Sequence, residues 1–112
     1  MAKVIITQEL KNEVFSTFKN QSVNVFERMK SLEERPHTGK SLTSVDGIVI
    51  KELKYETFRF YFLTDGHILK FGTQQELAIL LITFIRMSKK KDQQKTIDEI
   101  IDILKSFGSE AF

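Results

Sequence analysis

A nearly continuous apolar run at positions 77–85 constrains the fold more than any other feature of the sequence. Only Thr83 interrupts these nine residues, and a run of this length is too long for an edge strand. A helix that crosses a bilayer would need about 20 apolar residues. The run therefore predicts a central β-strand that is covered on both faces.

The N-terminal third predicts a strand followed by a helical hairpin. A β-branched run at 3–7 indicates the strand, and Thr7 can cap the helix that apolar spacing predicts over residues 8–19. Ser22 is a plausible cap for a second helix, which ends before Pro36 because the residue preceding a proline is disfavoured in helical geometry. Two antiparallel helices joined by a tight turn are the simplest interpretation.

The remaining sequence predicts strands and a closing helix. We expect a loop at 37–41, strands at 48–54 and 58–63, and a hairpin at Asp65-Gly66 that leads into 67–71. The segment 96–107 has one apolar face, with a capping box from Thr96 to Glu99 and Gly108 placed to end the helix. The order predicts one α+β domain over residues 1–112, with the helices packed on one face of an antiparallel sheet.

Missing motifs exclude several classes of function. The chain has no cysteine, no phosphate-binding or dinucleotide-binding glycine motif and no nucleophile elbow, and its two histidines are 30 residues apart. We therefore expect no metal site, no cofactor and no small-molecule substrate. No secretory signal opens the chain, so we expect a cytoplasmic protein with no membrane partner.

The clearest chemical signal is a basic segment at 86–95. The net charge of the chain is only +2, yet this segment holds five basic residues and one acid. It lies between the apolar strand and the start of the closing helix, where backbone N–H groups favour phosphate. A phosphodiester site is one interpretation. The other is a solvated lysine-rich loop, and short basic runs of that kind are common.

A second cationic pair depends on the register of two predicted strands. If Lys54 pairs with Arg59, the two side chains share a face and Glu52 lies opposite Tyr61. If Lys54 pairs with Phe58, Arg59 points the other way. Arg59 could join the cluster near Arg86, or it could form an ion pair with Glu52 or Glu56, and the sequence leaves both open.

In the order of its predicted elements and in the spacing of its motifs, the chain resembles the RelE/ParE toxin superfamily, and within it the phage-derived, HigB-like branch. Residues 51–54 read KELK and residues 58–62 read FRFYF, similar to the family's strand pair E-L-R followed by [FY]-R-[VIL]-x-[YF]. Residues 80–84 read LLITF and residues 89–96 read KKKDQQKT, similar to the family's apolar strand and K-K-x-x-Q-K-T segment. The resemblance covers nearly the whole chain and implies a RelE-like fold.

The resemblance implies the toxin of a type II toxin–antitoxin pair, a ribosome-dependent mRNA endonuclease that needs no metal. Its partners would be a cognate antitoxin protein, mRNA and the ribosome. The implied catalytic residues are Arg59, Arg86, Lys54 and Lys89. The implied RNA-binding residues are Lys51, Lys90, Lys91 and Lys95.

Two differences from the family pattern keep an alternative open. Lysine stands at position 54 where arginine is common, and the closing helix has no tyrosine. Family relatives of the ParE type act on DNA gyrase and cleave nothing. A gyrase-directed toxin or an inactive relative is therefore the alternative to the nuclease.

Overall fold

The computed structural model of the protein describes residues 2–65, 69–70, 78–108 and 111–112. Strand β1 (Ala2–Ile6) leads into helix α1 (Gln8–Phe18), the short helical turn η1 (Lys19–Gln21), helix α2 (Ser22–Lys30) and the turn η2 (Ser31–Glu33). Five strands follow: β2 (Lys40–Val45), β3 (Ile48–Tyr55), β4 (Phe58–Asp65), β5 (Leu69–Lys70) and β6 (Ala78–Lys89). The turn η3 (Lys90–Asp92) joins β6 to helix α3 (Gln93–Phe107). This α+β order agrees with the class that the sequence predicts.

Strand β6 is an interior strand of the sheet, between β1 and β4, as its apolar run predicts. The strand order is β1-β6-β4-β3-β2, and β5 pairs with β6 outside that path. The expectation of a purely antiparallel sheet is wrong, because β1 runs parallel to β6 from Ala2 opposite Leu80 to Ile6 opposite Phe84. A parallel pair needs a long connection, and nearly the whole chain lies between these two strands.

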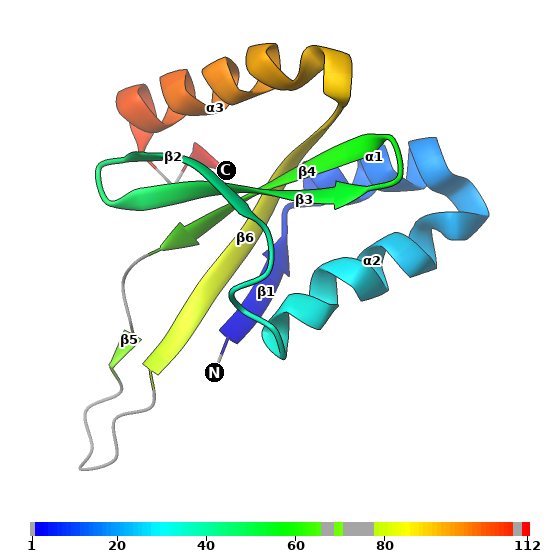
Figure 1. Cartoon of the computed structure of the whole chain (residues 1–112), viewed down its shortest axis with the longest axis horizontal. Coiled ribbons are helices and arrows are strands. Elements are labelled where there is room, and N and C mark those ends of the chain that lie inside the picture. Colours follow the sequence, from blue (N-terminus) through cyan, green and yellow to red (C-terminus); the bar gives the residue numbers. More distant parts are fainter. Residues whose placement is uncertain (1, 66–68, 71–77, 109–110) are drawn as a thin grey trace.

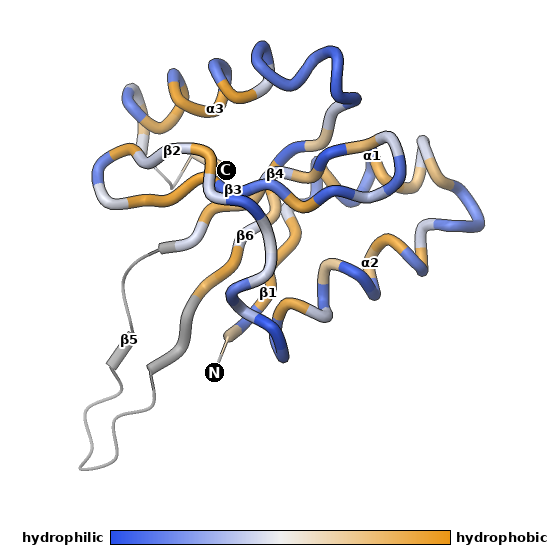
Figure 2. The backbone as a smooth tube through the Cα atoms, in the orientation of Figure 1, coloured by the Kyte–Doolittle hydropathy of each residue, from blue (hydrophilic) through white to orange (hydrophobic). Residues whose placement is uncertain are grey.

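The helices cover both faces of the sheet, which corrects the expectation that they share one face. Along β4, Phe60 and Phe62 pack in the core beneath α1 and α2, whereas Tyr61 and Leu63 pack in the core beneath α3. Figure 1 shows α3 on one side of the strands and the α1–α2 hairpin on the other. The apolar edge of α3 faces the sheet and its polar edge faces away (Figure 2). Because β6 is apolar on both faces, both faces need a cover.

Of the three predicted N-terminal helix caps, only Thr7 is confirmed. The backbone N–H of Leu10 donates to Thr7 Oγ1 at 3.4 Å, as a cap requires. Ser22 is not a cap, because η1 runs directly into α2 and the buried Ser22 hydroxyl donates to the Val14 carbonyl at 3.2 Å. Thr96 is not a cap either, because α3 already begins at Gln93 and the Thr96 hydroxyl donates to the Asp92 carbonyl at 3.0 Å.

Strand β2 begins inside the segment that we expect to be a loop. Its side chains are mostly polar and exposed, so the sequence carries no alternation that would indicate a strand. Gly39 precedes it with φ of +101°, and a Cβ there would lie 2.8 Å from the Phe62 ring. The close approach of Gly39 to the Phe62 ring and the pairing with β3 together fix the position of β2. The predicted turn at Asp65-Gly66 and the strand at 67–71 fall largely outside the described residues.

Candidate functional site

The register of β3, β4 and β6 brings three predicted site residues to one end of the sheet. Lys54 pairs with Arg59, Arg59 pairs with Ser88, and the neighbouring row pairs Phe58 with Lys89. This is the first of the two registers considered above, so Lys54 and Arg59 share the face that α3 covers. Lys54 is exposed, whereas Arg59 is only 7% exposed.

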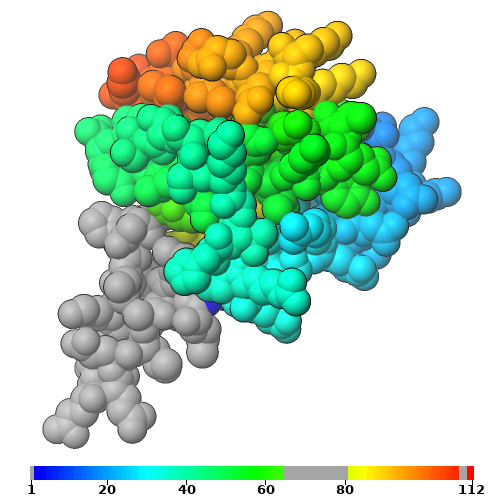
Figure 3. All heavy atoms as spheres, viewed as in Figure 1, coloured from blue at the N-terminus to red at the C-terminus, as the bar shows by residue number. Residues whose placement is uncertain are grey.

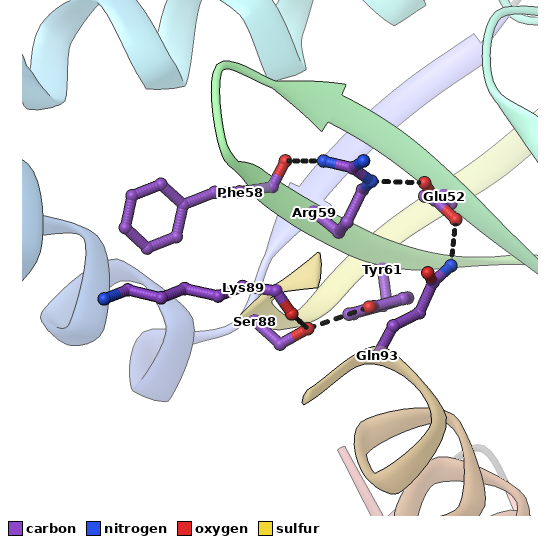
Figure 4. Close-up of polar contacts among 7 residues, drawn as sticks. All are labelled: Glu52, Phe58, Arg59, Tyr61, Ser88, Lys89 and Gln93. Carbon is purple, nitrogen blue, oxygen red and sulfur yellow. Dashed lines mark hydrogen bonds and ion pairs between the residues drawn. The ribbon is translucent and has the colours of Figure 1, made fainter. Parts of the chain in front are cut away.

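Arg59 is held by a buried network (Figure 4). Its Nε donates to Glu52 Oε1 at 2.8 Å, and its Nη1 donates to the Phe58 carbonyl at 3.2 Å. Gln93, the first residue of α3, donates from Nε2 to the other Glu52 oxygen at 2.6 Å. The network therefore joins β3, β4 and the start of α3.

The Glu52–Arg59 ion pair changes what Arg59 can do chemically. Both side chains are about nine-tenths buried, and removing two charges from water carries a large desolvation penalty. The carboxylate already neutralises the guanidinium, so a phosphate could bind Arg59 only by sharing it with Glu52. The ion pair with Glu52 is one of the two arrangements that the sequence left open.

Tyr61 and Ser88 form a second polar contact beside this network. The Tyr61 hydroxyl and Ser88 Oγ are 2.9 Å apart, and Ser88 Oγ also donates to the Lys89 carbonyl at 3.0 Å. Burial raises the pKa of Tyr61 above its ordinary value of 10.0, and the hydrogen bond with Ser88 offsets part of that rise. Tyr61 is therefore a neutral hydrogen-bonding group that fixes the end of β6.

Arg86 lies on the β1 side of the sheet, away from the Glu52–Arg59 network. Its guanidinium stacks over the Phe112 ring at 5.1 Å and donates from Nη1 to the Ile85 carbonyl at 2.8 Å. Glu9 Oε2 lies 3.6 Å from the same Nη1. These contacts place Arg86 in a pocket of about 280 Å³ between the start of α1 and the end of the chain.

The predicted RNA-binding lysines separate into two groups. Lys90, Lys91 and Lys95 are exposed and lie with Lys89 where β6 meets η3 and α3. Lys51 lies on the opposite face of β3, with its Nζ 5.7 Å from the centre of the Phe62 ring. The structure therefore groups four of the predicted basic residues at the junction and places Lys51 apart from them.

One groove runs between α1 and the junction, and we call it the α1-side groove. Its volume is about 480 Å³, and Met87 and Ser88 of β6 form part of its lining. Three lysines (Lys89, Lys91 and Lys95) and three carboxylates (Glu13, Asp92 and Glu99) also line it. Partial burial raises the pKa of Glu13 above its ordinary value of 4.5, and the positive charge of Arg86 offsets part of that rise.

A second groove runs between β2 and α3, and we call it the β2-side groove. Its volume is about 600 Å³. Lys90 and Lys91 are its only charged residues, and no carboxylate belongs to the lining that the structure describes. Two glutamines, one threonine and three aliphatic side chains complete it: Gln93, Gln94, Thr43, Leu42, Ile97 and Ile101. In the space-filling view α3 lies along the β2–β3 hairpin (Figure 3).

Two further kinds of feature are missing from the described residues. No three His, Asp or Glu side chains there gather closely enough to hold a metal ion. In the same part of the chain, no helix has the length and apolarity needed to cross a membrane.

Two residues of the site could not have been found from the sequence. Gln93 and Glu13 gain their surroundings only through tertiary contacts, with Glu52 in one case and with the groove beside β6 in the other. The sequence signal for Glu52 was its position as a possible partner of Arg59, which the structure confirms.

Compared with known proteins, the chain matches no family model, no curated protein and no solved structure.

Proposed function

We propose that the protein is the toxin of a type II toxin–antitoxin pair and acts in the cytoplasm as a ribosome-dependent mRNA endonuclease of the RelE type. The observation that carries the proposal is the position of Lys54 and Arg59 on one face at the end of the sheet where β6 leads into Lys90 and Lys91. These residues come from three separate segments. They are the same segments on which the resemblance to the RelE/ParE superfamily rests.

The exposed ammonium groups suit cleavage through the ribose 2′-OH. Such a step places extra negative charge on the phosphorus oxygens, and nearby cations stabilise it. Lys54 supplies that charge and can transfer a proton, while Lys90 and Lys91 hold the RNA backbone. Lys89, predicted to be catalytic, and Lys95, predicted to bind RNA, line the α1-side groove on the opposite face. Arg59 reaches a phosphate by sharing its guanidinium with Glu52. Arg86 lies in a separate pocket beside Glu9, so it does not hold the same phosphate as Arg59. No metal is required.

The antitoxin would neutralise the protein by covering the junction lysines with acidic or apolar helical segments. An acidic surface would complement the lysines electrostatically and would exclude RNA from them.

Translation in a cell-free system tests the proposal directly. The 5′ ends of the mRNA are mapped by primer extension after the protein is added, with and without ribosomes. New ends within codons, found only on translated message, are the expected result. Undisturbed translation without new ends would rule out the nuclease.

A toxin that binds without cutting is the second candidate, and the Glu52–Arg59 ion pair favours it. A guanidinium neutralised within the protein is poorly placed to stabilise a phosphorane. DNA gyrase is the target that the resemblance suggests for such a toxin. Inhibition of gyrase supercoiling, together with intact mRNA in the cell-free assay, would establish this candidate, and failure in both assays would leave an inactive relative.

A further inference from the structure

We propose that the β2-side groove holds one unpaired nucleotide of the RNA, with its phosphate on Lys90 and Lys91 and its base on the aliphatic floor. This inference rests on the proposed function and names the part of the surface that the RNA uses. The two grooves share Lys91 and therefore offer the RNA two different paths from the same residue.

The charges of the two linings decide between the paths. In the α1-side groove, Glu13, Asp92 and Glu99 balance the three lysines, so a phosphodiester gains little net attraction there. In the β2-side groove, two lysines are present and the described lining contains no carboxylate. RNA is therefore attracted more strongly to the β2-side groove. In the α1-side groove the carboxylates repel the phosphates and offset the attraction of the lysines.

The floor of the β2-side groove fits the face of a base. Leu42 and Ile101 are half-buried and lie beside Ile97, so they offer an apolar surface that still reaches solvent. Proteins that recognise single-stranded RNA splay a base out of the strand, usually stack it on an aromatic ring or a guanidinium, and bind its edge through polar contacts. Here three aliphatic side chains take the place of the ring. The volume of about 600 Å³ lies within the range of small-ligand sites, about 300–1,000 Å³.

The polar rim favours bases that carry an amino group. Gln93 and Gln94 donate their Nε2 groups to Glu52 and Asp98, and among the described residues no hydrogen bond occupies either carbonyl oxygen. Two free acceptors complement the exocyclic amino groups of cytosine, adenine and guanine, which uracil lacks. We therefore expect oligo(C) to bind more tightly than oligo(U) of the same length.

A pair of matched threonine variants tests the path. Thr43→Glu adds a negative charge to the β2-side groove, and Thr17→Glu adds the same charge to the α1-side groove; both threonines are exposed. Binding of fluorescein-labelled oligo(C) is followed by anisotropy for the wild type and both variants. Circular dichroism melting confirms that each variant is folded.

We expect Thr43→Glu to weaken binding about tenfold and Thr17→Glu to change it by less than about twofold. Equal effects of the two variants, or a larger effect of Thr17→Glu, would overturn the inference while leaving RNA binding established. Equal binding of oligo(C) and oligo(U) by the wild type would remove the assigned role of the glutamines. A wild-type protein that binds neither RNA would contradict the proposed function and this inference together.

Discussion

The two sides of the sheet differ in what they bury. Beneath α1 and α2 the core is mainly rings and aliphatic chains, including Phe60, Phe62 and Phe84, and its helices bury the uncharged Ser22 hydroxyl. Beneath α3 the sheet buries the Tyr61 hydroxyl and, close by, the Glu52–Arg59 ion pair. Apolar burial stabilises a fold directly, by about 25 cal/mol per Å².

The ion pair carries a desolvation cost that well-packed apolar residues of similar size would avoid. The α3 side therefore accepts a buried pair of charges that stability alone does not require, whereas the α1–α2 side buries no such pair among the described residues. This difference supports placing the RNA site of the proposed function on the α3 side.

The largest effect should come from truncating the aromatic core. Phe62 is fully buried, with its ring centre 4.8 Å from that of Phe84, so Phe62→Ala should lower the free energy of unfolding by about 3–5 kcal/mol. Urea denaturation measures the loss. Phe107→Ala is the control, because Phe107 is 74% exposed and should change stability by less than about 0.5 kcal/mol. Similar losses for the two variants would contradict the packing described for this side.

Breaking the ion pair tests the polar side. Glu52→Ala leaves the buried Arg59 guanidinium without a counter-charge, which should cost on the order of 3 kcal/mol. The double variant Glu52→Leu with Arg59→Met should recover most of that stability, because it removes both charges. Urea denaturation of the three proteins checks this, and a double variant no more stable than Glu52→Ala would show that the pair itself stabilises the fold.

Two lysines of β3, one on each face of the sheet, can be substituted to test which face carries the proposed activity. Lys54 shares a strand face with Ile50 of the α3-side core, whereas Lys51 lies over Phe62 on the other face. Lys54→Ala should lower the rate of mRNA cutting by about 10²-fold, the usual cost of removing one charge-stabilising group. Lys51→Ala should leave the rate nearly unchanged. Primer extension in the cell-free system measures both rates, and a larger loss for Lys51→Ala would move the site to the other face.

The smallest effect concerns Glu13 in the α1-side groove. Burial raises the pKa of Glu13 above 4.5 in the folded protein, so the folded state holds this proton more tightly than the unfolded state does. The stability that this tighter proton binding contributes is therefore lost as the pH rises from the ordinary pKa of Glu13 through its raised pKa in the folded protein. Glu13→Gln has no such loss, so its stability relative to the wild type should rise between about pH 4 and about pH 7. Urea denaturation at both pH values measures the difference, and a relative fall would mean that attraction to Arg86 outweighs burial.

The sequence predicts the elements of this fold better than it predicts their arrangement. The apolar run of β6 identifies a central strand because burial on both faces leaves a continuous pattern. The position of α3 on the opposite face from α1 and α2 leaves no local signal, since an amphipathic helix fits either face. The same limit applies to β2, whose polar residues are ordered by pairing with β3.

For the site, too, local features are visible in the sequence, whereas contacts between distant segments are not. The lysines at 89–91 are visible as a run, and the structure keeps them together. The contact of Arg59 with Glu52, and of Arg86 with Glu9 and Phe112, depends on side chains from distant segments. Residue type therefore identified the cations, but it could not tell which of them are neutralised within the protein.

The parallel pairing of β1 with β6 has a consequence for synthesis. Ala2 must wait for Leu80 before it gains its partner in the sheet, and at 5–20 residues per second that delay is roughly 4–16 s. Strand β6 also supplies Phe84 to one core and Ile85 to the other, so neither core can close earlier. A nascent chain that stops short of β6 has no finished layer on either side. Folding is therefore postponed until the residues of β6 have been translated.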